Sequence, residues 1–335
     1  MRQRSSDIEV RWERLKERGE TFISVLSGDI RYLSSPSIPE PPLSALIISK
    51  EGVVGFAPKM EEARALELSD VEEVRTFSQL LPSYSKDLKS GLRKYLRSIG
   101  KEIVESDAKL DLRPIKVRKK NVVGELRRVK SPDELTKIKR SMAIAGKVSD
   151  LLWDLSSKCE TELALAMEMN YELLRRGAQD LAFKTIVASG SNSKYPHHSP
   201  TSDRLNGAVV CDFGAIYEGY CSDLTRTFFI GSEKERVRFD EIYDIVKESQ
   251  TSASNEIKEG VKGKKIDSTA RRVIEKAGYG DWFLHSTGHG LGLEVHEKPS
   301  ISPKSADQLM KGDVITVEPG IYLDFGIRIE DDFMV

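Results

Sequence analysis

Residues 209–230 place two aspartates inside apolar, β-rich sequence, and this stretch constrains the fold more than any other. Its sequence is VVCDFGAIYEGYCSDLTRTFFI, and Tyr217-Glu218-Gly219 between the two apolar runs indicates a β-hairpin. If Tyr217 and Glu218 form the turn, Asp212 is expected to face Asp223. Directly opposed like charges destabilise a sheet, and a half-buried carboxylate pair requires a proton or a cation. The stretch therefore predicts a divalent metal site.

A second acidic hairpin is predicted near the end of the sequence, over residues 314–330. Its sequence is VITVEPGIYLDFGIRIE, and a turn at Asp324 puts Glu318 opposite Glu330, although a bulge in either hairpin would shift its register by one. Between the hairpins, residues 286–297 (STGHGLGLEVHE) contain two of the five histidines. Four carboxylates and a nearby imidazole suit two fairly hard divalent ions.

Four motifs occur in one order along the chain: DFGAIYEGYCSDLTRT, GHGLGLEVHE, VEPGIY and RIED. In their order and approximate spacing they resemble the pita-bread metallopeptidases (peptidase family M24). This family includes methionine aminopeptidase, Xaa-Pro aminopeptidase and Xaa-Pro dipeptidase, or prolidase. The resemblance is strong over residues 122–335 and loose before them.

The resemblance implies an α+β fold with two domains. Residues 1–121 would form a small creatinase/prolidase-like α/β domain, and residues 122–335 a pita-bread (creatinase/aminopeptidase) catalytic domain with pseudo-two-fold internal symmetry. The order of predicted elements agrees, because helix, helix, strand and acidic hairpin follow one another twice in the second domain. Its first helix begins with Ser131-Pro-Asp-Glu, a capping box. The other helices are expected over 161–176, 240–259 and 266–277.

The resemblance also implies a role for each site residue. The five positions that match the family's metal ligands are Asp212, Asp223, His289, Glu318 and Glu330. Asp223 and Glu330 would bridge two divalent ions, and Glu318 would also take the proton of the attacking water. Oxygen-rich ligation with one imidazole predicts Mn²⁺ or Co²⁺, and Zn²⁺ or Fe²⁺ is compatible with it.

Two further histidines, His197 and His296, match catalytic positions of the family. There an imidazole can hydrogen-bond the substrate carbonyl or the developing oxyanion. His198 and His285 are expected at surface or packing positions. Cys211 is expected on the strand face opposite Asp212, and packing is also the favoured interpretation for Cys221.

Three functions follow from the resemblance. The first is a dinuclear Xaa-Pro dipeptidase, and the second is an Xaa-Pro aminopeptidase that acts on longer peptides. The third is a non-catalytic pita-bread binding protein, although such relatives usually lose metal ligands and this chain keeps all five. Many prolidases carry an arginine after HEKP that helps to hold the dipeptide carboxylate, and here Ser300 stands in its place. This difference weakens the case for the dipeptidase, which is still preferred over the aminopeptidase.

The charge of the chain is balanced, with 52 basic and 53 acidic residues among 335. Such balance argues against nucleic-acid or anionic-membrane partners, which require a basic excess. No apolar run approaches the ~18 residues of a membrane span, and the N-terminus lacks a signal-peptide core. We therefore expect a cytoplasmic protein without membrane or nucleic-acid partners. Its predicted partners are Xaa-Pro dipeptides or short peptides and, from the resemblance, a second copy in a homodimer.

Overall fold

The computed structural model describes residues 6–38 and 40–335. The N-terminus was predicted to lack a signal peptide, and its residues 1–5 lie outside the described part. The chain divides into two compact units, Met1–Arg127 and Arg128–Val335. The predicted domain boundary after residue 121 falls just before helix α5 (Val122–Arg128). As a boundary between independently folding domains, it remains a proposal.

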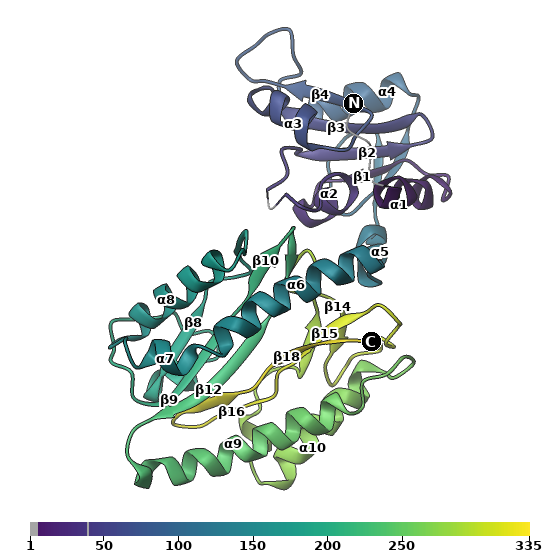
Figure 1. The fold of residues 1–335 in the computed structure, drawn as a ribbon. Coiled ribbons are helices and arrows are strands. Elements are labelled where there is room, and N and C mark those ends of the chain that lie inside the picture. The colour runs from purple at the N-terminus through teal and green to yellow at the C-terminus, as the bar shows by residue number, and fades with distance from the viewer. Residues whose placement is uncertain (1–5, 39) are drawn as a thin grey trace. The chain divides into compact units, whose positions relative to one another are not determined.

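The first unit is built on a six-stranded sheet in the order β4-β3-β2-β1-β5-β6 (Figure 1). β2 and β3 form an antiparallel hairpin in which Ser49 lies opposite Gly52. Helix α4 packs on this sheet through the buried side chains of Leu92 and Leu96. The strands are β1 Phe22–Ser24, β2 Ala45–Ser49, β3 Gly52–Pro58, β4 Glu73–Phe77, β5 Ile103–Ser106 and β6 Lys116–Lys119. The helices are α1 Ser6–Lys16, α2 Ser27–Ser34, α3 Glu62–Leu68 and α4 Leu88–Ser98.

The second unit contains two acidic hairpins, each joined to further strands. β9 pairs with β8 and β12 in the first half, and β13 and β18 flank β15 in the second. The first-half strands are β7 Asp180–Leu181, β8 Ile186–Ser189, β9 Gly207–Phe213, β10 Ala215–Tyr217, β11 Tyr220–Cys221 and β12 Leu224–Ile230. The second-half strands are β13 Gly288–Gly290, β14 Glu297–Ile301, β15 Val314–Val317, β16 Gly320–Tyr322, β17 Gly326–Arg328 and β18 Asp331–Met334.

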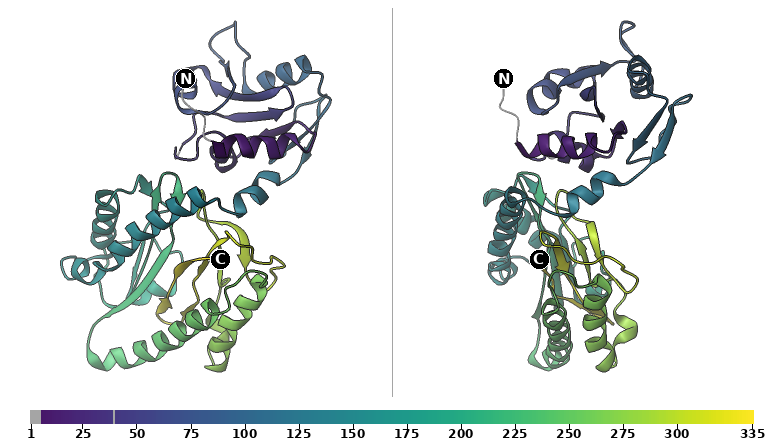
Figure 2. Two further views of the ribbon diagram at one scale, coloured as in Figure 1. Left: turned by 45° about the vertical axis from the view of Figure 1, so that its right-hand side comes forward. Right: turned by 90° about the vertical axis from the view of Figure 1, so that its right-hand side faces the viewer.

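Paired helices cover the strands of each half. In the first half α6 and α8 share a buried apolar cluster with β8 and β9, and Cys211 lies in this cluster, on the face opposite Asp212 as predicted. In the second half α9 and α10 lie side by side (Figure 2), with α9 packed on β15 and β17 and α10 on β14. The helices are α6 Pro132–Ser149, α7 Leu152–Ser156, α8 Glu162–Arg175, α9 Glu233–Ser254 and α10 Gly263–Lys276. Helix pair, strand and hairpin therefore occur twice.

Side-chain caps set where these helices begin. The predicted capping box at the start of α6 is present, because Ser131 and Glu134 each accept a hydrogen bond from the other's backbone N–H. The helix predicted over residues 240–259 is present as α9, but its predicted start was wrong, since α9 spans Glu233–Ser254. The carboxylate of Glu235 accepts hydrogen bonds from the backbone N–H and the hydroxyl of Ser232, which starts the helix one turn or more earlier. No helix in the described part of the chain is both long and apolar enough to cross a bilayer.

The register of the second acidic hairpin agrees with the prediction. Gly320 pairs with Arg328 and Val317 with Asp331, so Glu318 and Glu330 stand at opposed positions. The register of the first hairpin was predicted wrongly. Tyr217 pairs with Tyr220, and Asp212 lies opposite Thr225, two residues beyond Asp223. Because side chains alternate with a period of two, a shift of two residues leaves both aspartates on the predicted face.

The turn itself explains the shift. Glu218 and Gly219 are its central residues, and both have positive φ (44° and 85°), as a two-residue type I′ turn requires. We expect Gly219→Ala to lower the free energy of unfolding by about 1 kcal/mol, because a side chain with a Cβ is strained in this left-handed conformation. Urea unfolding measures the effect. In the control variant Gly146→Ala, the new methyl group enters open space on α6 and should instead stabilise the protein by about 0.5–1 kcal/mol.

Candidate metal centre

The two acidic hairpins are joined by an isolated β-bridge between Thr225 and Glu330. The backbone N–H of Glu330 donates to the carbonyl of Thr225 at 3.2 Å, and the Thr225 hydroxyl donates to the Glu330 carboxylate at 2.6 Å. This junction brings the acids of both halves to one cavity of about 540 Å³. All seven predicted site residues line it: His197, Asp212, Asp223, His289, His296, Glu318 and Glu330.

Three of these side chains, Asp223, His289 and Glu330, each bring one ligand atom to within 4.8 Å of the other two. His289 Nε2 lies 3.7 Å from a carboxylate oxygen of Asp223 and 3.4 Å from one of Glu318. The other ring nitrogen, Nδ1, contacts the carbonyl of Gly290 at 3.1 Å. A carbonyl only accepts, so Nδ1 carries the proton and Nε2 turns its lone pair toward the acids. This is the tautomer that a metal ligand requires.

The acids of the cavity hold their protons unusually tightly. Burial, and then the charge of Glu330, raises the pKa of Asp223 well above its usual range. Burial and Glu318 do the same to the pKa of Glu330, and burial together with Asp212 raises the pKa of Glu318 to about 7. Burial, followed by the neighbouring His296, lowers the pKa of His289 to about 4, so its ring is neutral. If all of these acids were ionised, the cluster would contain more negative charge than its own side chains can balance.

Asp212 is balanced only in part. One of its oxygens accepts a hydrogen bond from the buried guanidinium of Arg328. Its other oxygen, Oδ1, is buried and has no hydrogen-bond donor among the residues that the structure describes. An orphaned buried carboxylate oxygen beside a cluster of uncompensated acids is the environment that a divalent cation stabilises. The donor set, four carboxylates and one neutral imidazole, fits such ions.

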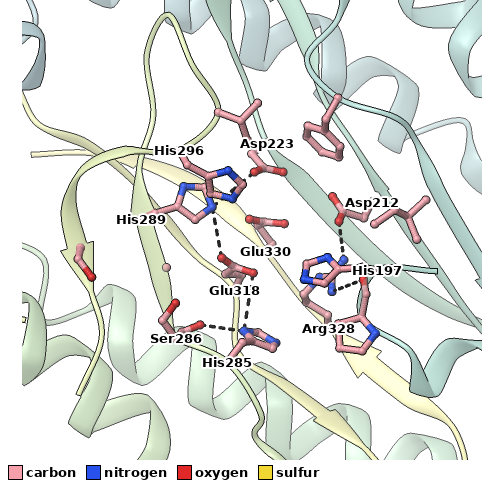
Figure 3. A pocket seen from close by; sticks show the side chains of 16 residues that line it. His197, Asp212, Asp223, His285, Ser286, His289, His296, Glu318, Arg328 and Glu330 are labelled. Carbon is pink, nitrogen blue, oxygen red and sulfur yellow. Dashed lines mark hydrogen bonds and ion pairs between the residues drawn. The ribbon is translucent and has the colours of Figure 1, made fainter. Parts of the chain in front are cut away.

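His197 and His296 reach the cavity from different elements. His197 belongs to the loop after β8, and His296 immediately precedes β14, with its ring centroid 4.2 Å from that of His289. In Figure 3 the two rings lie on opposite sides of the carboxylates. A substrate bound over the acids would therefore have an imidazole on each side.

His285, which was expected at a surface or packing position, is a further member of this site. His285 lines the cavity, its Nδ1 donates to the Ser286 carbonyl at 2.8 Å, and its Nε2 accepts from the Tyr322 hydroxyl at 2.9 Å. The Tyr322 oxygen in turn accepts from Arg328 at 3.0 Å. This chain of hydrogen bonds ends at Asp212. The chain joins residues up to 116 positions apart, so no local sequence pattern predicts these hydrogen bonds.

Cys221 does not line the cavity. Its Sγ lies 3.7 Å from the carbonyl of Leu293, and its side chain is buried. The packing role that was favoured for Cys221 agrees with this position. Ser300 does line the cavity, and its hydroxyl contacts that of Ser302 at 2.9 Å.

Comparison with known proteins connects this geometry with a family. The model of metallopeptidase family M24 matches residues 136–335. The chain belongs to this family. An uncharacterized peptidase of Staphylococcus epidermidis is 37% identical over 316 residues, which cover 89% of this chain and 87% of the relative.

Solved structures of a prolidase and of an X-Pro aminopeptidase resemble this chain over nearly its full length. A prolidase from Pyrococcus furiosus has a TM-score of 0.81 and 32% identity, and the match covers 97% of this chain and 96% of the prolidase. An X-Pro aminopeptidase from Thermotoga maritima has a TM-score of 0.85 and 32% identity, with 98% and 94% covered. The predicted α+β pita-bread fold is thereby confirmed, and the chain is a metallopeptidase. Membership in a metallopeptidase family implies divalent metal ions.

The raised pKa of Glu318 predicts how the metal-free protein responds to pH. The folded state releases this proton near pH 7, whereas the unfolded chain releases it at a lower pH. The free energy of unfolding therefore falls as the pH rises toward and through 7. His285 and His289, with pKa values lowered to about 4, oppose this trend only below about pH 6.5. We expect the melting temperature of the EDTA-treated protein to fall between about pH 6.5 and 8.

Glu318→Gln is the control for this pH dependence. It removes the titrating carboxyl group, so the metal-free variant should lose less stability over the same pH window. Saturating Mn²⁺ should reverse the slope for the unmodified protein, because metal competes with protons for the same oxygens. A melting temperature that is independent of pH in the metal-free protein would contradict the electrostatic argument.

Proposed function

We propose that this chain is a dinuclear metal-dependent Xaa-Pro dipeptidase, which hydrolyses the bond between an N-terminal residue and proline. The observation that carries the proposal is the buried acidic cluster at the junction of the two hairpins. The solved M24 structures that match the chain support it, since they include a prolidase, an X-Pro aminopeptidase and a Xaa-Pro dipeptidase from Bacillus anthracis.

Five residues would hold two divalent ions in this proposal. They are Asp212, Asp223, His289, Glu318 and Glu330, with Asp223 and Glu330 shared between the two ions. When bound, the ions polarise the scissile carbonyl and lower the pKa of the attacking water. Mn²⁺ or Co²⁺ is the proposed metal, because four carboxylates make an oxygen-rich site, and Zn²⁺ or Fe²⁺ is compatible with the same donors.

The remaining roles belong to side chains that contact the substrate. Glu318 would take the proton of the attacking water. Cations nearby lower the pKa that burial has raised, so its position rather than a high pKa makes it an effective base. His197 and His296 would donate hydrogen bonds to the substrate carbonyl and to the oxyanion that develops from it. The apolar side chains of Phe183, Ile186 and Val295 line the same cavity and offer a surface for the proline ring.

A second candidate, an Xaa-Pro aminopeptidase for longer peptides, is favoured by one specific observation. A dipeptidase must hold the free carboxylate of proline, usually with a cation. Among the described residues that line the cavity, Arg328 is the only arginine or lysine. Its N–H groups already donate to Asp212, Thr225, Tyr322 and the Pro196 carbonyl. These contacts argue against Arg328 as the residue that binds the proline carboxylate.

Substrate length separates the two candidates. We expect kcat/KM for Ala-Pro and Met-Pro to exceed that for an Ala-Pro-Xaa tripeptide when Mn²⁺ or Co²⁺ is present. Equal or faster cleavage of the tripeptide would favour the aminopeptidase. Absence of any cleavage with metal confirmed bound would move the protein to the non-catalytic binding class.

The proposed location is the cytoplasm, and the proposed assembly is the homodimer that the family resemblance implies. The peptide is the proposed partner besides the second copy, and no nucleic-acid or membrane partner is proposed. Light scattering after size-exclusion chromatography would measure the mass of the assembly, and a monomeric mass would contradict the dimer.

A further inference from the structure

A buried carboxylate outside the acidic cluster organises the loop that carries His197. Glu162 is the first residue of α8, and its side chain is fully buried. Its two oxygens accept five hydrogen bonds from four residues, all in the segment 189–201. The donors are Ser189 N (2.7 Å), Asn192 Nδ2 (3.0 Å), His198 Nε2 (2.8 Å), Thr201 N (3.0 Å) and Thr201 Oγ1 (2.9 Å).

Such a carboxylate is a rigid anchor. Removing a charged group from water is unfavourable unless hydrogen bonds replace the lost water. These donors replace it, and those from His198, Asn192 and the backbone lower the pKa of Glu162 although burial raises it. The anchor therefore stays ionised at neutral pH, and movement of the segment would break several charge-assisted hydrogen bonds at once.

The anchored segment contains the turn that presents His197. The backbone N–H of His198 donates to the carbonyl of Tyr195 at 3.2 Å and closes this turn. His198 points to Glu162, whereas the ring of the preceding His197 lines the cavity (Figure 3). From the cavity side, Arg328 donates to the carbonyl of Pro196 at 3.3 Å. The turn is thus fixed from two directions, at Pro196 and at His198, the two residues on either side of His197 in the sequence.

The second half of the unit holds its own histidine segment in a comparable way. Asp267, a buried residue of α10, accepts hydrogen bonds from the backbone N–H and the hydroxyl of Thr287 at 3.2 and 2.9 Å. Thr287 lies two residues before His289. In each half, a buried carboxylate on the second helix therefore fixes the backbone beside a histidine of the cavity.

We propose that Glu162 and His198 are positioning residues. Their hydrogen bond holds the imidazole of His197 in the position and orientation needed to contact the substrate carbonyl. The inference rests on the proposed role of His197 and assigns a function to His198, which the sequence left at a surface or packing position. Groups that orient a catalytic side chain typically contribute 10- to 100-fold to activity.

A matched pair of variants at position 198 tests the proposal. His198→Ala removes the donor to Glu162 and should lower kcat for Xaa-Pro hydrolysis about 10- to 100-fold, with KM and metal content nearly unchanged. His198→Gln places an amide N–H near the former Nε2 position and should restore most of kcat. Equal losses in the two variants, or a loss that follows metal content or melting temperature, would overturn the proposal.

A double-mutant cycle asks whether His198 acts through His197. In a His197→Ala background, the further change His198→Ala should cost less than about 2-fold in kcat, because no imidazole remains to be positioned. The full single-mutant loss in that background would contradict the mechanism.

Hydrogen exchange supplies a readout that does not depend on activity. In His198→Ala, the amides of residues 193–201 should exchange faster, while those of the β15 and β18 strands stay unchanged. Unchanged exchange in the loop would overturn the positioning role. If the unmodified enzyme cleaved no Xaa-Pro peptide while the loop amides responded as expected, the proposed substrate would be wrong and the anchoring of His197 would stand.

Discussion

Replacement of Asp223 by asparagine, or of Glu330 by glutamine, is expected to abolish peptide hydrolysis and to leave fewer than two metal ions bound per chain. Both carboxylates lie at the centre of the acidic cluster, so a neighbouring acid cannot take over the role of the lost one. The fold should survive, because each change removes one of several mutually repelling charges whose pKa values are already raised. Elemental analysis and circular dichroism, measured beside kcat, test the prediction.

Asp324→Asn is the matched control for these two variants. Asp324 belongs to the same hairpin as Glu330, but it is exposed at the turn and paired with Arg238. Its replacement should leave metal content and activity unchanged, since exposed ion pairs contribute little. Two tightly held ions in a folded but inactive Asp223→Asn variant would contradict the assignment of Asp223 as a bridging ligand.

His197→Ala and His296→Ala should show the next largest effect, a decrease of kcat with metal content preserved. Loss of one donor to a developing oxyanion typically costs about 100- to 1,000-fold in kcat. Both rings line the cavity, and in Figure 3 they lie on opposite sides of the carboxylates, so each is expected to act on the substrate rather than on the ions. Substantially reduced metal content in either variant would make that histidine a ligand and add to the proposed five.

The two hairpins show what a sequence pattern can and cannot predict. Placing the turn at Asp324 correctly predicted that Glu318 lies opposite Glu330. The prediction succeeds because the strands continue in one register from Tyr322 back to Val314. The turn of the first hairpin was misassigned by one residue, since the need for two positive φ values selects Glu218 and Gly219. The aspartates still share a face, so the alternation of strand side chains preserved the site prediction despite the error.

Contacts between elements that are distant in the sequence could not be predicted from strand alternation or turn residues. Glu162 and His198 are 36 residues apart, and their pairing depends on how α8 packs against the loop after β8. Tyr322 and His285 meet only because two segments of the second half come together at the cavity. Neither pair has a periodic or spaced signature in the sequence. The supporting polar network could therefore be found only from the three-dimensional structure.

Metal titration of the stripped enzyme tests the central claim most directly. Chain stripped with EDTA would receive increasing equivalents of Mn²⁺, while hydrolysis of Ala-Pro and, as a control, Ala-Ala is followed. The account predicts no cleavage without metal, a plateau of Ala-Pro hydrolysis at two ions per chain, and much slower cleavage of Ala-Ala. A plateau at one ion per chain, activity that survives metal removal, or equal rates on the two dipeptides would contradict it.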